Sequence, residues 1–253
     1  MVKTHVCAYK TVKVTKRRIL LISIVLIVAA IVGFTVWAYT PLGPTETAVE
    51  SLLDSETVSI IQGKRIIFYP SEPTDTGIII YQGGHVDPRS YSVLAHRLAE
   101  SGYTVFIPKM LFNLAVFDKD AALGIIDENP EIEKWVLIGH SLGGAMAASL
   151  VYDEPDDFHG LVLLAAYPPE NNDLSSYDVK VTTIYGSKDM VATPSEIEES
   201  FDLLPADARK ILIEGGNHAQ FGYYGKQSGD GAATITPEEQ LRIVLDEILD
   251  IIQ

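Results

Sequence analysis

Cysteine is almost absent from this 253-residue chain, in which the single example is Cys7. No disulfide can form within the chain, so a folded body depends on its hydrophobic core, for which a hydrophobic content of 47% is sufficient. Internal repeats and, after the N-terminus, low-complexity stretches are also absent. The length suits one domain with an accessory segment rather than two full domains.

Basic residues are scarce beyond the N-terminus. Six of the 19 Lys and Arg residues lie in the first 18 positions, which hold no acid, and the other 13 share the rest of the chain with all 34 Asp and Glu residues. An acidic body of this kind is repelled by nucleic acid and by anionic lipid headgroups, so no nucleic-acid partner is expected. Simple solubility is the alternative interpretation of the charge.

Motifs for metals and nucleotides are missing as well. The sequence contains no zinc-ligand spacing and no Walker loop, and Gly83-Gly84 and Gly215-Gly216 are too short to form a G-x-G-x-x-G fingerprint. We therefore expect no metal and no cofactor.

One long apolar run is present, from Ile19 to Tyr39, and it contains no charged residue. As a helix rising about 1.5 Å per residue, this run can cross a hydrocarbon core of about 30 Å. Because the basic residues precede it, we expect residues 1–18 in the cytoplasm and the rest of the chain outside, anchored to the cell membrane. A long cleaved signal peptide is the alternative.

Residues 40–46 predict a short linker, and residues 47–253 then alternate apolar strands with helical patterns. Strands are expected at 57–62, 65–69, 77–81, 103–107, 135–138, 160–166, 179–185 and 210–213, the first two as a hairpin at a sheet edge. Helices are expected at 47–53, 91–100, 115–126, 142–152 and 195–203, and from Thr236, where Glu239 completes a capping box. This pattern predicts an α/β fold, with a mostly parallel sheet covered by helices on both faces. Ligands bind such sheets beyond the carboxyl ends of the strands.

A serine between glycines follows the strand expected at 135–138, in the sequence Gly139-His140-Ser141-Leu142-Gly143. The G-x-S-x-G pattern between a strand and a helix is typical of a nucleophile elbow, a tight turn that presents the serine hydroxyl above the sheet. The N–H of Leu142 then points to where an oxyanion forms. We interpret Ser141 as a nucleophile and Leu142 as an oxyanion-hole donor. A turn without chemistry is the alternative.

A serine nucleophile needs a base that takes its proton and an acid that orients the base, in the chain order serine, acid, histidine. Asp189 follows the strand expected at 179–185, and His218 is the only one of six histidines that lies beyond both Ser141 and Asp189. We predict Asp189 as the acid and His218 as the base; an Asx-turn is the alternative for Asp189. His140 is expected to pack or hydrogen-bond beneath the serine.

The strand at 77–81 is followed by Gln82-Gly83-Gly84-His85, where glycines let backbone N–H groups approach a substrate. We predict the N–H of Gly84 as the second oxyanion donor, with His85 as the next choice and a plain glycine turn as the alternative. His85 and Tyr223 are predicted substrate contacts, although packing explains the Tyr223 loop equally well. The short connection at 166–179 excludes a large lid, which leaves the site open or covered by 110–117 and 221–235.

Together these stretches resemble the α/β-hydrolase superfamily, and more narrowly a bacterial family of membrane-anchored α/β-hydrolases akin to the dienelactone-hydrolase-like group. The likeness spans roughly residues 45–253, through 81–88, 139–144, 166–168, 185–189 and the particular sequence GGNHAQFG at 215–222. It implies Ser141 as nucleophile, Asp189 as acid and His218 as base. Dienelactone hydrolases use cysteine as the nucleophile, so their lactone substrate is not carried over.

The predicted site and the resemblance lead to one expected activity. This is hydrolysis of a small-molecule or lipid-like carboxylic ester, or a related acyl compound, through an acyl-enzyme. Two alternatives stay open: an acyltransferase with the same triad, and a non-catalytic binding module on the same scaffold.

Overall fold

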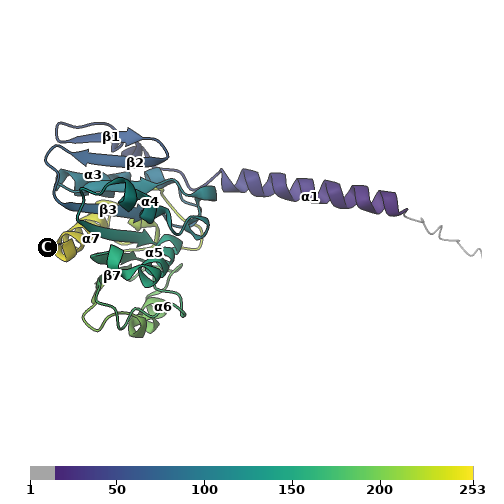
Figure 1. Ribbon diagram of the computed structural model, residues 1–253. Helices are drawn as coiled ribbons and strands as arrows, with labels where there is room; N and C mark the ends of the chain where they lie inside the picture. The colour runs from purple at the N-terminus through teal and green to yellow at the C-terminus, as the bar shows by residue number, and fades with distance from the viewer. Residues whose placement is uncertain (1–14, 253) are drawn as a thin grey trace, which may run out of the picture. The chain divides into compact units, whose positions relative to one another are not determined.

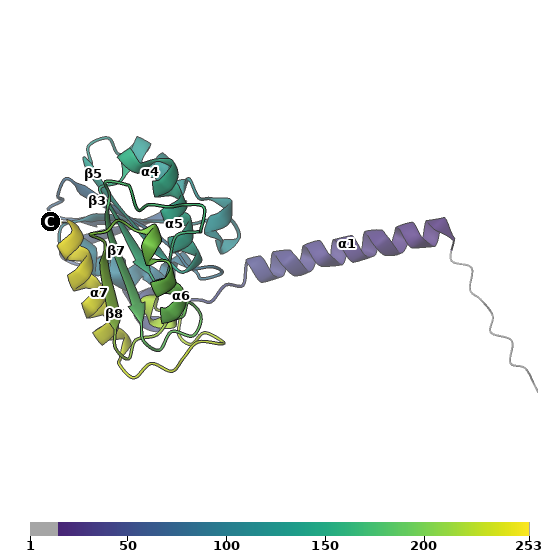
Figure 2. The ribbon, with the colours of Figure 1, turned by 90° about the horizontal axis from the view of Figure 1, so that it is seen from below.

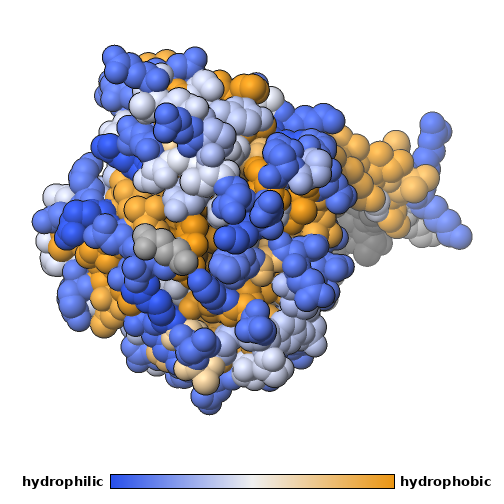
Figure 3. Space-filling model, turned by 60° about the vertical axis from the view of Figure 1, so that its left-hand side comes forward, coloured by the Kyte–Doolittle hydropathy of each residue, from blue (hydrophilic) through white to orange (hydrophobic). Residues whose placement is uncertain are grey.

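The computed structural model describes residues 15–252 and divides the chain between Thr40 and Pro41 into two compact units. The first unit contains helix α1 (Lys16–Ala38), whose most apolar 18-residue window has a mean hydropathy of 3.1 and is not buried. The part of the helix that is visible in Figure 3 is mostly apolar, and its sequence is apolar after the basic residues Lys16, Arg17 and Arg18. The helix is long and apolar enough to cross a membrane, a test that a signal sequence also passes. Most of the predicted tail 1–18, including Cys7, lies outside the described residues.

Eight strands of the second unit form one sheet in the order β1-β2-β4-β3-β5-β6-β7-β8. Strand β2 is antiparallel to both of its neighbours, and the other neighbouring pairs are parallel. The predicted hairpin therefore lies at one side of a mostly parallel sheet, as the sequence indicates (Figure 1). The strands are β1 (Val58–Gln62), β2 (Arg65–Pro70), β3 (Thr76–Tyr81), β4 (Thr104–Pro108), β5 (Lys134–His140), β6 (Gly160–Leu164), β7 (Lys180–Gly186) and β8 (Arg209–Ile213).

The parallel strands end together at one edge of the sheet, here called the carboxyl edge. The register pairs Tyr81 at the end of β3 with Gly139 near the end of β5, and Gly186 at the end of β7 with Ile213 at the end of β8. Residues that directly follow these strands consequently emerge at the same edge. This edge is where α/β sheets bind ligands.

Helices cover both faces of the sheet (Figures 1 and 2). Helices α3 (Ser92–Glu100) and α7 (Pro237–Ile252) pack on one face, and α4 (Ala121–Glu128) and α5 (Leu142–Asp153) pack on the other. The short helices α2 (Glu46–Glu50) and α6 (Pro194–Glu199) complete the unit. Because the central strands are covered on both sides, they are continuous apolar runs rather than alternating ones.

The last helix, α7, begins as predicted. The hydroxyl of Thr236 accepts the N–H of Glu239 at 3.2 Å, and the Glu239 carboxylate accepts the N–H of Thr236 at 2.7 Å. These two reciprocal bonds make the expected capping box.

The segment after β4 differs from the prediction. The sequence predicts one helix over 115–126, but Ala115–Phe117 form a short 3-10 turn and α4 begins only at Ala121. At Asp118 the backbone leaves the helical region (φ −140°, ψ 40°), and its carboxylate accepts the N–H of Leu111 at 2.6 Å. A side chain that binds nearby backbone in this way competes with helix formation.

Candidate active site

Ser141 lies between β5 and α5, in the turn that the sequence predicts. Its backbone has φ 52° and ψ −125°, a conformation that costs a residue with a side chain on the order of 1–3 kcal/mol. The flanking glycines make the turn feasible. A Cβ on Gly143 would lie 2.7 Å from the carbonyl oxygen of Tyr81, and a Cβ on Gly144 would lie 2.7 Å from that of Gly139. Strand, turn and helix therefore pack too closely for side chains at either glycine.

Two backbone N–H groups near Ser141 are available to a ligand. Within residues 15–252, neither the N–H of Leu142 nor that of Gly84 donates to an acceptor. The two residues are neighbours, since a Cβ on Gly84 would lie 3.1 Å from Cδ2 of Leu142. Leu142 also begins α5, so the helix dipole adds positive potential there. This arrangement suits an anionic oxygen.

The N–H groups on either side of Gly84 are already bonded. Gly83 donates to the hydroxyl of Tyr91 at 2.8 Å, and His85 donates to the carbonyl oxygen of Asn113 at 2.9 Å. The N–H of His85, the second choice for the oxyanion donor, is therefore committed to the segment that follows β4.

Asp189 and His218 form a buried pair. Oδ2 of Asp189 lies 2.8 Å from Nδ1 of His218, and the two side chains are 0% and 1% exposed. Oδ1 of Asp189 accepts the N–H groups of Val191 and Ala192, each at 2.8 Å. The Asx-turn, which was the alternative interpretation of Asp189, is thus present. Its bonds orient the carboxylate toward the imidazole of His218. Nε2 of His218 is the ring nitrogen that this contact does not use.

His140 connects the serine turn to His218. The two imidazole ring centroids are 4.6 Å apart, and Nδ1 of His140 lies 2.7 Å from the hydroxyl of Tyr91. Burial, and secondarily the nearby His218, lower the pKa of His140 well below its ordinary value. His140 is therefore neutral. Because the oxygen of the Tyr91 hydroxyl accepts the N–H of Gly83, that hydroxyl donates its proton to Nδ1 of His140. This is the supporting role predicted for His140.

The serine hydroxyl itself is not bonded. Within residues 15–252, Oγ of Ser141 forms no hydrogen bond, to His218 or to any other group. Apo active sites commonly have long contacts between nucleophile and base that shorten when substrate binds.

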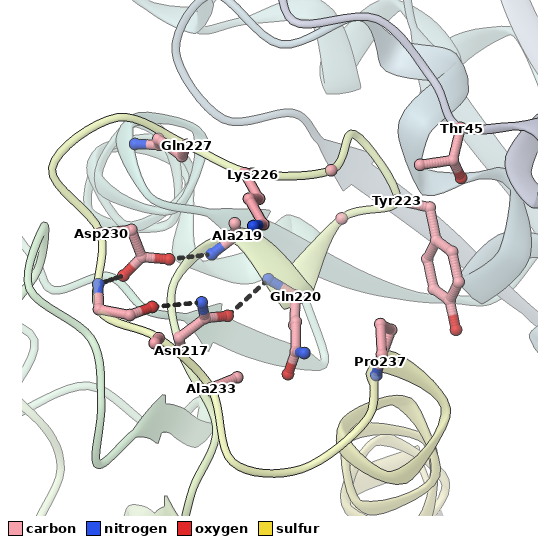
Figure 4. Close-up of a pocket in the computed structure, with 14 residues that line it drawn as sticks. Thr45, Asn217, Ala219, Gln220, Tyr223, Lys226, Gln227, Asp230, Ala233 and Pro237 are labelled. Carbon is pink, nitrogen blue, oxygen red and sulfur yellow. Dashed lines mark hydrogen bonds between the residues drawn. The ribbon is translucent and has the colours of Figure 1, made fainter.

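Asp230, which the sequence analysis did not select, supports the histidine loop. Its carboxylate accepts the N–H of Ala219 at 2.9 Å and that of His218 at 3.4 Å, and it also accepts from Gly231 at 2.7 Å (Figure 4). The only sequence signal is its place between Gly229 and Gly231, which marks a turn but not a partner.

Gln240 is a second support that sequence reasoning missed. Gln240 lies on α7 and is fully buried. Its Nε2 donates to the carbonyl oxygen of Asn217 at 3.0 Å, and its Oε1 accepts the N–H of Asn217 at 3.1 Å. Gln240 precedes Val244 by four residues and so falls on the buried stripe of the helix. A polar residue there requires a buried partner, which is the signal that could have found it.

A cavity of about 540 Å³ lies beneath the loop after His218, and neither Ser141 nor Gly84 lines it (Figure 4). Tyr223 does line it, with its ring near Thr45 and Pro237. The ring is 8% exposed and packs with Ala48 and Val93. The position of Tyr223 therefore agrees with packing, which was the alternative for this loop. The position gives no support to the predicted contact between Tyr223 and substrate.

Several solved structures with the same architecture carry the name of a hydrolase, an esterase or a lipase. A crystal structure of MGS-MChE2, an alpha/beta hydrolase from the metagenome of lagoon sediments of Mar Chica, Morocco, matches with a TM-score of 0.58 at 20% identity, over 76% of this chain and 98% of that one. The monoacylglycerol lipase of Paleococcus ferrophilus matches with a TM-score of 0.59 at 15% identity, over 76% and 99%. Esterase 2 of Thermogutta terrifontis, in its tabun-phosphoramylated form, matches with a TM-score of 0.58 at 13% identity, over 79% and 96%. At these identities the likeness establishes the fold.

Sequence comparison gives the family. No curated protein matches the chain in sequence. The family model described as the alpha/beta hydrolase family matches residues 77–242, which include Gly84, Ser141, Asp189 and His218. Since the match covers more than half of the sequence, the chain belongs to the alpha/beta hydrolase family and is an enzyme of the hydrolase type.

Proposed function

We propose that the chain is a membrane-anchored serine hydrolase that cleaves carboxylic esters, with Ser141 as nucleophile, His218 as base and Asp189 as acid. The observation that carries the proposal is the buried Asp189–His218 pair, at 2.8 Å, on the same sheet edge as a serine in a strained turn. A carboxylate and a histidine without a catalytic role are usually exposed to solvent, so a buried pair of the two is typical of a functional site. The esterase and lipase names among the structural relatives agree with this function.

The proposed reaction proceeds in two steps. Nε2 of His218 takes the proton of Ser141 as Oγ attacks the carbonyl carbon, and the negative oxygen is held by the N–H groups of Leu142 and Gly84. The imidazolium, stabilised by Asp189, gives its proton to the departing alcohol and leaves an acyl-enzyme. His218 then takes a proton from water as the water oxygen attacks the acyl carbon. As the bond from that carbon to Oγ breaks, the imidazolium returns the proton to Oγ, which releases the acid and the free serine.

Kinetics of a serine variant test this function. The full-length protein in detergent is expected to hydrolyse p-nitrophenyl butyrate, and Ser141→Ala is expected to lower kcat by roughly 10⁴–10⁶. Ser149→Ala, on the helix that follows the turn, serves as the matched control and should retain most activity. Near-normal turnover by the Ser141 variant, with the fold intact by circular dichroism, would refute the assignment.

The membrane part of the proposal is that α1 spans the cell membrane, with residues 1–18 in the cytoplasm and the hydrolase unit outside. It is supported by the apolar length of α1 and by the six basic residues that precede or begin it. Protease added to intact cells should remove the hydrolase unit and leave the apolar segment in the membrane. A fully protected hydrolase unit would reverse the orientation, and release of an intact unit without protease would identify a cleaved signal peptide.

A further inference from the structure

Exposed apolar side chains gather at the carboxyl edge of the sheet. Six of them follow the ends of three parallel strands, with exposed fractions from 36% to 64%. We call this set the apolar rim: Leu111, Val116 and Phe117 after β4, Tyr167 after β6, and Met190 and Val191 after β7. Single exposed apolar residues are ordinary on soluble proteins, but a group at one edge marks an interaction surface.

The apolar rim adjoins the proposed active site. The segment after β4 is bonded to the oxyanion loop through the His85 N–H and the Asn113 carbonyl, and Cδ2 of Leu114 lies 3.8 Å from the position of a Cβ on Gly84. On the other side, the N–H of Met190 donates to Asp230, the residue that supports the histidine loop. The segments that carry the apolar rim thus contact both the oxyanion loop and the support of the histidine loop.

The polypeptide enters the hydrolase unit at this same edge. Leu42 pairs with Val86, directly after the oxyanion loop: its N–H donates to His85 and its carbonyl accepts from Asp87, each at 2.9 Å. Only residues 39–41 separate Leu42 from Ala38, the last residue of α1. An extended residue spans at most about 3.6 Å, so Leu42 lies within about 14 Å of the helix end, whatever direction the helix takes.

Charge excludes an electrostatic contact with the membrane. Beyond residue 18 the chain has 13 basic residues against 34 acidic ones, a balance that anionic headgroups repel. Leu42, where the hydrolase unit joins its tether, is thus the point held close to the end of α1. Exposed apolar groups on the same edge as Leu42 gain free energy if they are buried in the bilayer.

We infer that the apolar rim inserts into the bilayer that holds α1, and that the active site takes its acyl substrate from that bilayer. The substrate class is therefore a long-chain lipid ester, whose chain passes from the bilayer to Ser141 without exposing its methylenes to water. This inference rests on the proposed function and on the membrane anchor, and it adds the source of the substrate.

The test compares two esters that share a leaving group. The full-length protein is reconstituted in phosphatidylcholine vesicles and given p-nitrophenyl butyrate, which is water-soluble, or p-nitrophenyl palmitate, which resides in the bilayer. The rim variant is V116S/F117S, whose side chains are each 52% exposed. The matched control is L53S/I61S, whose side chains are 68% and 56% exposed and lie outside the apolar rim.

The rim variant is expected to lose about tenfold in kcat/KM for the palmitate and to stay within about twofold for the butyrate. The control should change neither value. An equal loss for both esters, or no loss for either, would overturn the inference.

A second measurement does not depend on activity. Brominated phosphatidylcholine should quench the fluorescence of the added tryptophan more in Phe117→Trp than in Ile61→Trp. Both variants retain Trp37, so the quenching of Trp37 is a shared background that the comparison removes. Equal quenching would contradict insertion. A wild-type protein that hydrolyses neither ester would instead refute the esterase proposal, and the quenching would still decide whether the apolar rim enters the bilayer.

Discussion

The turn that holds Ser141 and the loop that holds His218 are positioned by different means. The serine turn depends on backbone close-packing, in which glycines let strand, turn and helix meet. The histidine loop depends on side chains that are distant in sequence: Asp189, 29 residues away, Asp230, 12 residues away, and Gln240, which binds the neighbouring Asn217. The serine should therefore be sensitive to added volume, and the histidine to lost hydrogen bonds.

The largest effect is expected from Asp189→Asn in the histidine loop. An amide facing Nδ1 favours the imidazole tautomer with a proton on Nε2, which cannot act as the base for Ser141. We expect kcat for p-nitrophenyl butyrate to fall by about 10⁴. Asp202→Asn, an exposed carboxylate, is the control and should be neutral. A loss below about tenfold for Asp189→Asn would show that the carboxylate does not orient the base.

Gly143→Ala tests the serine turn. Its added Cβ would overlap backbone atoms of Tyr81 and Gln82, which cannot move as a side chain can. We expect a loss of about 1–3 kcal/mol in the free energy of unfolding and, through misplacement of Ser141, of about 10² in kcat/KM. Thermal melts and kinetics measure both.

Gly124→Ala, on helix α4, is the matched control for that variant. A Cβ there meets nothing within 4 Å, and alanine favours a helix, so its stability should be unchanged or higher by up to about 1 kcal/mol. If the two alanine variants behaved alike, close-packing at the serine turn would not be the constraint that sets its geometry.

Asp230→Ala should have a smaller effect on the histidine loop. It leaves the N–H groups of His218 and Ala219 without their acceptor but keeps the Asp189 contact. We expect kcat to fall roughly tenfold, equivalent to about 1.4 kcal/mol, with KM little changed. Lys226→Ala, an exposed change in the same loop, should leave both constants alone. A change in KM alone would assign Asp230 to substrate binding instead.

The smallest effect is a dependence of stability on pH through His140. Its pKa is lowered in the folded state, so below an unfolded value of about 6.5 the unfolded chain binds a proton that the folded one does not. Stability is then complete above about pH 6.5 and falls as pH decreases, by up to about 1.4 kcal/mol per pH unit. His140→Gln should reduce this slope in melts between pH 7 and 5. An unchanged slope would indicate that other groups cause the acid sensitivity.

The contrast between the two regions also explains what the sequence could predict. The strands, the capped last helix and the serine turn depend on short patterns of apolar residues, caps and glycines, and these predictions agree with the structure. The contacts of Asp230 and Gln240 depend on how distant segments meet, which no local pattern specifies. The 115–126 helix failed for a related reason, because Asp118 binds Leu111 across a fold of the chain.

The broad family and the narrower group also differ in what supports them. The comparisons give the alpha/beta hydrolase family, while the narrower likeness to the dienelactone-hydrolase-like group, drawn from GGNHAQFG, stays a prediction. His85 likewise stays a predicted substrate contact, although its N–H is committed to Asn113.

The central claim is that Ser141 is an activated nucleophile. The most direct measurement is to treat the full-length protein in detergent with a fluorophosphonate probe and to locate the adduct by peptide mass spectrometry. The account predicts one adduct per chain, on the peptide that contains Ser141, and its loss in both Ser141→Ala and denatured protein. An adduct on another residue, or no labelling of a folded and otherwise active enzyme, would contradict it.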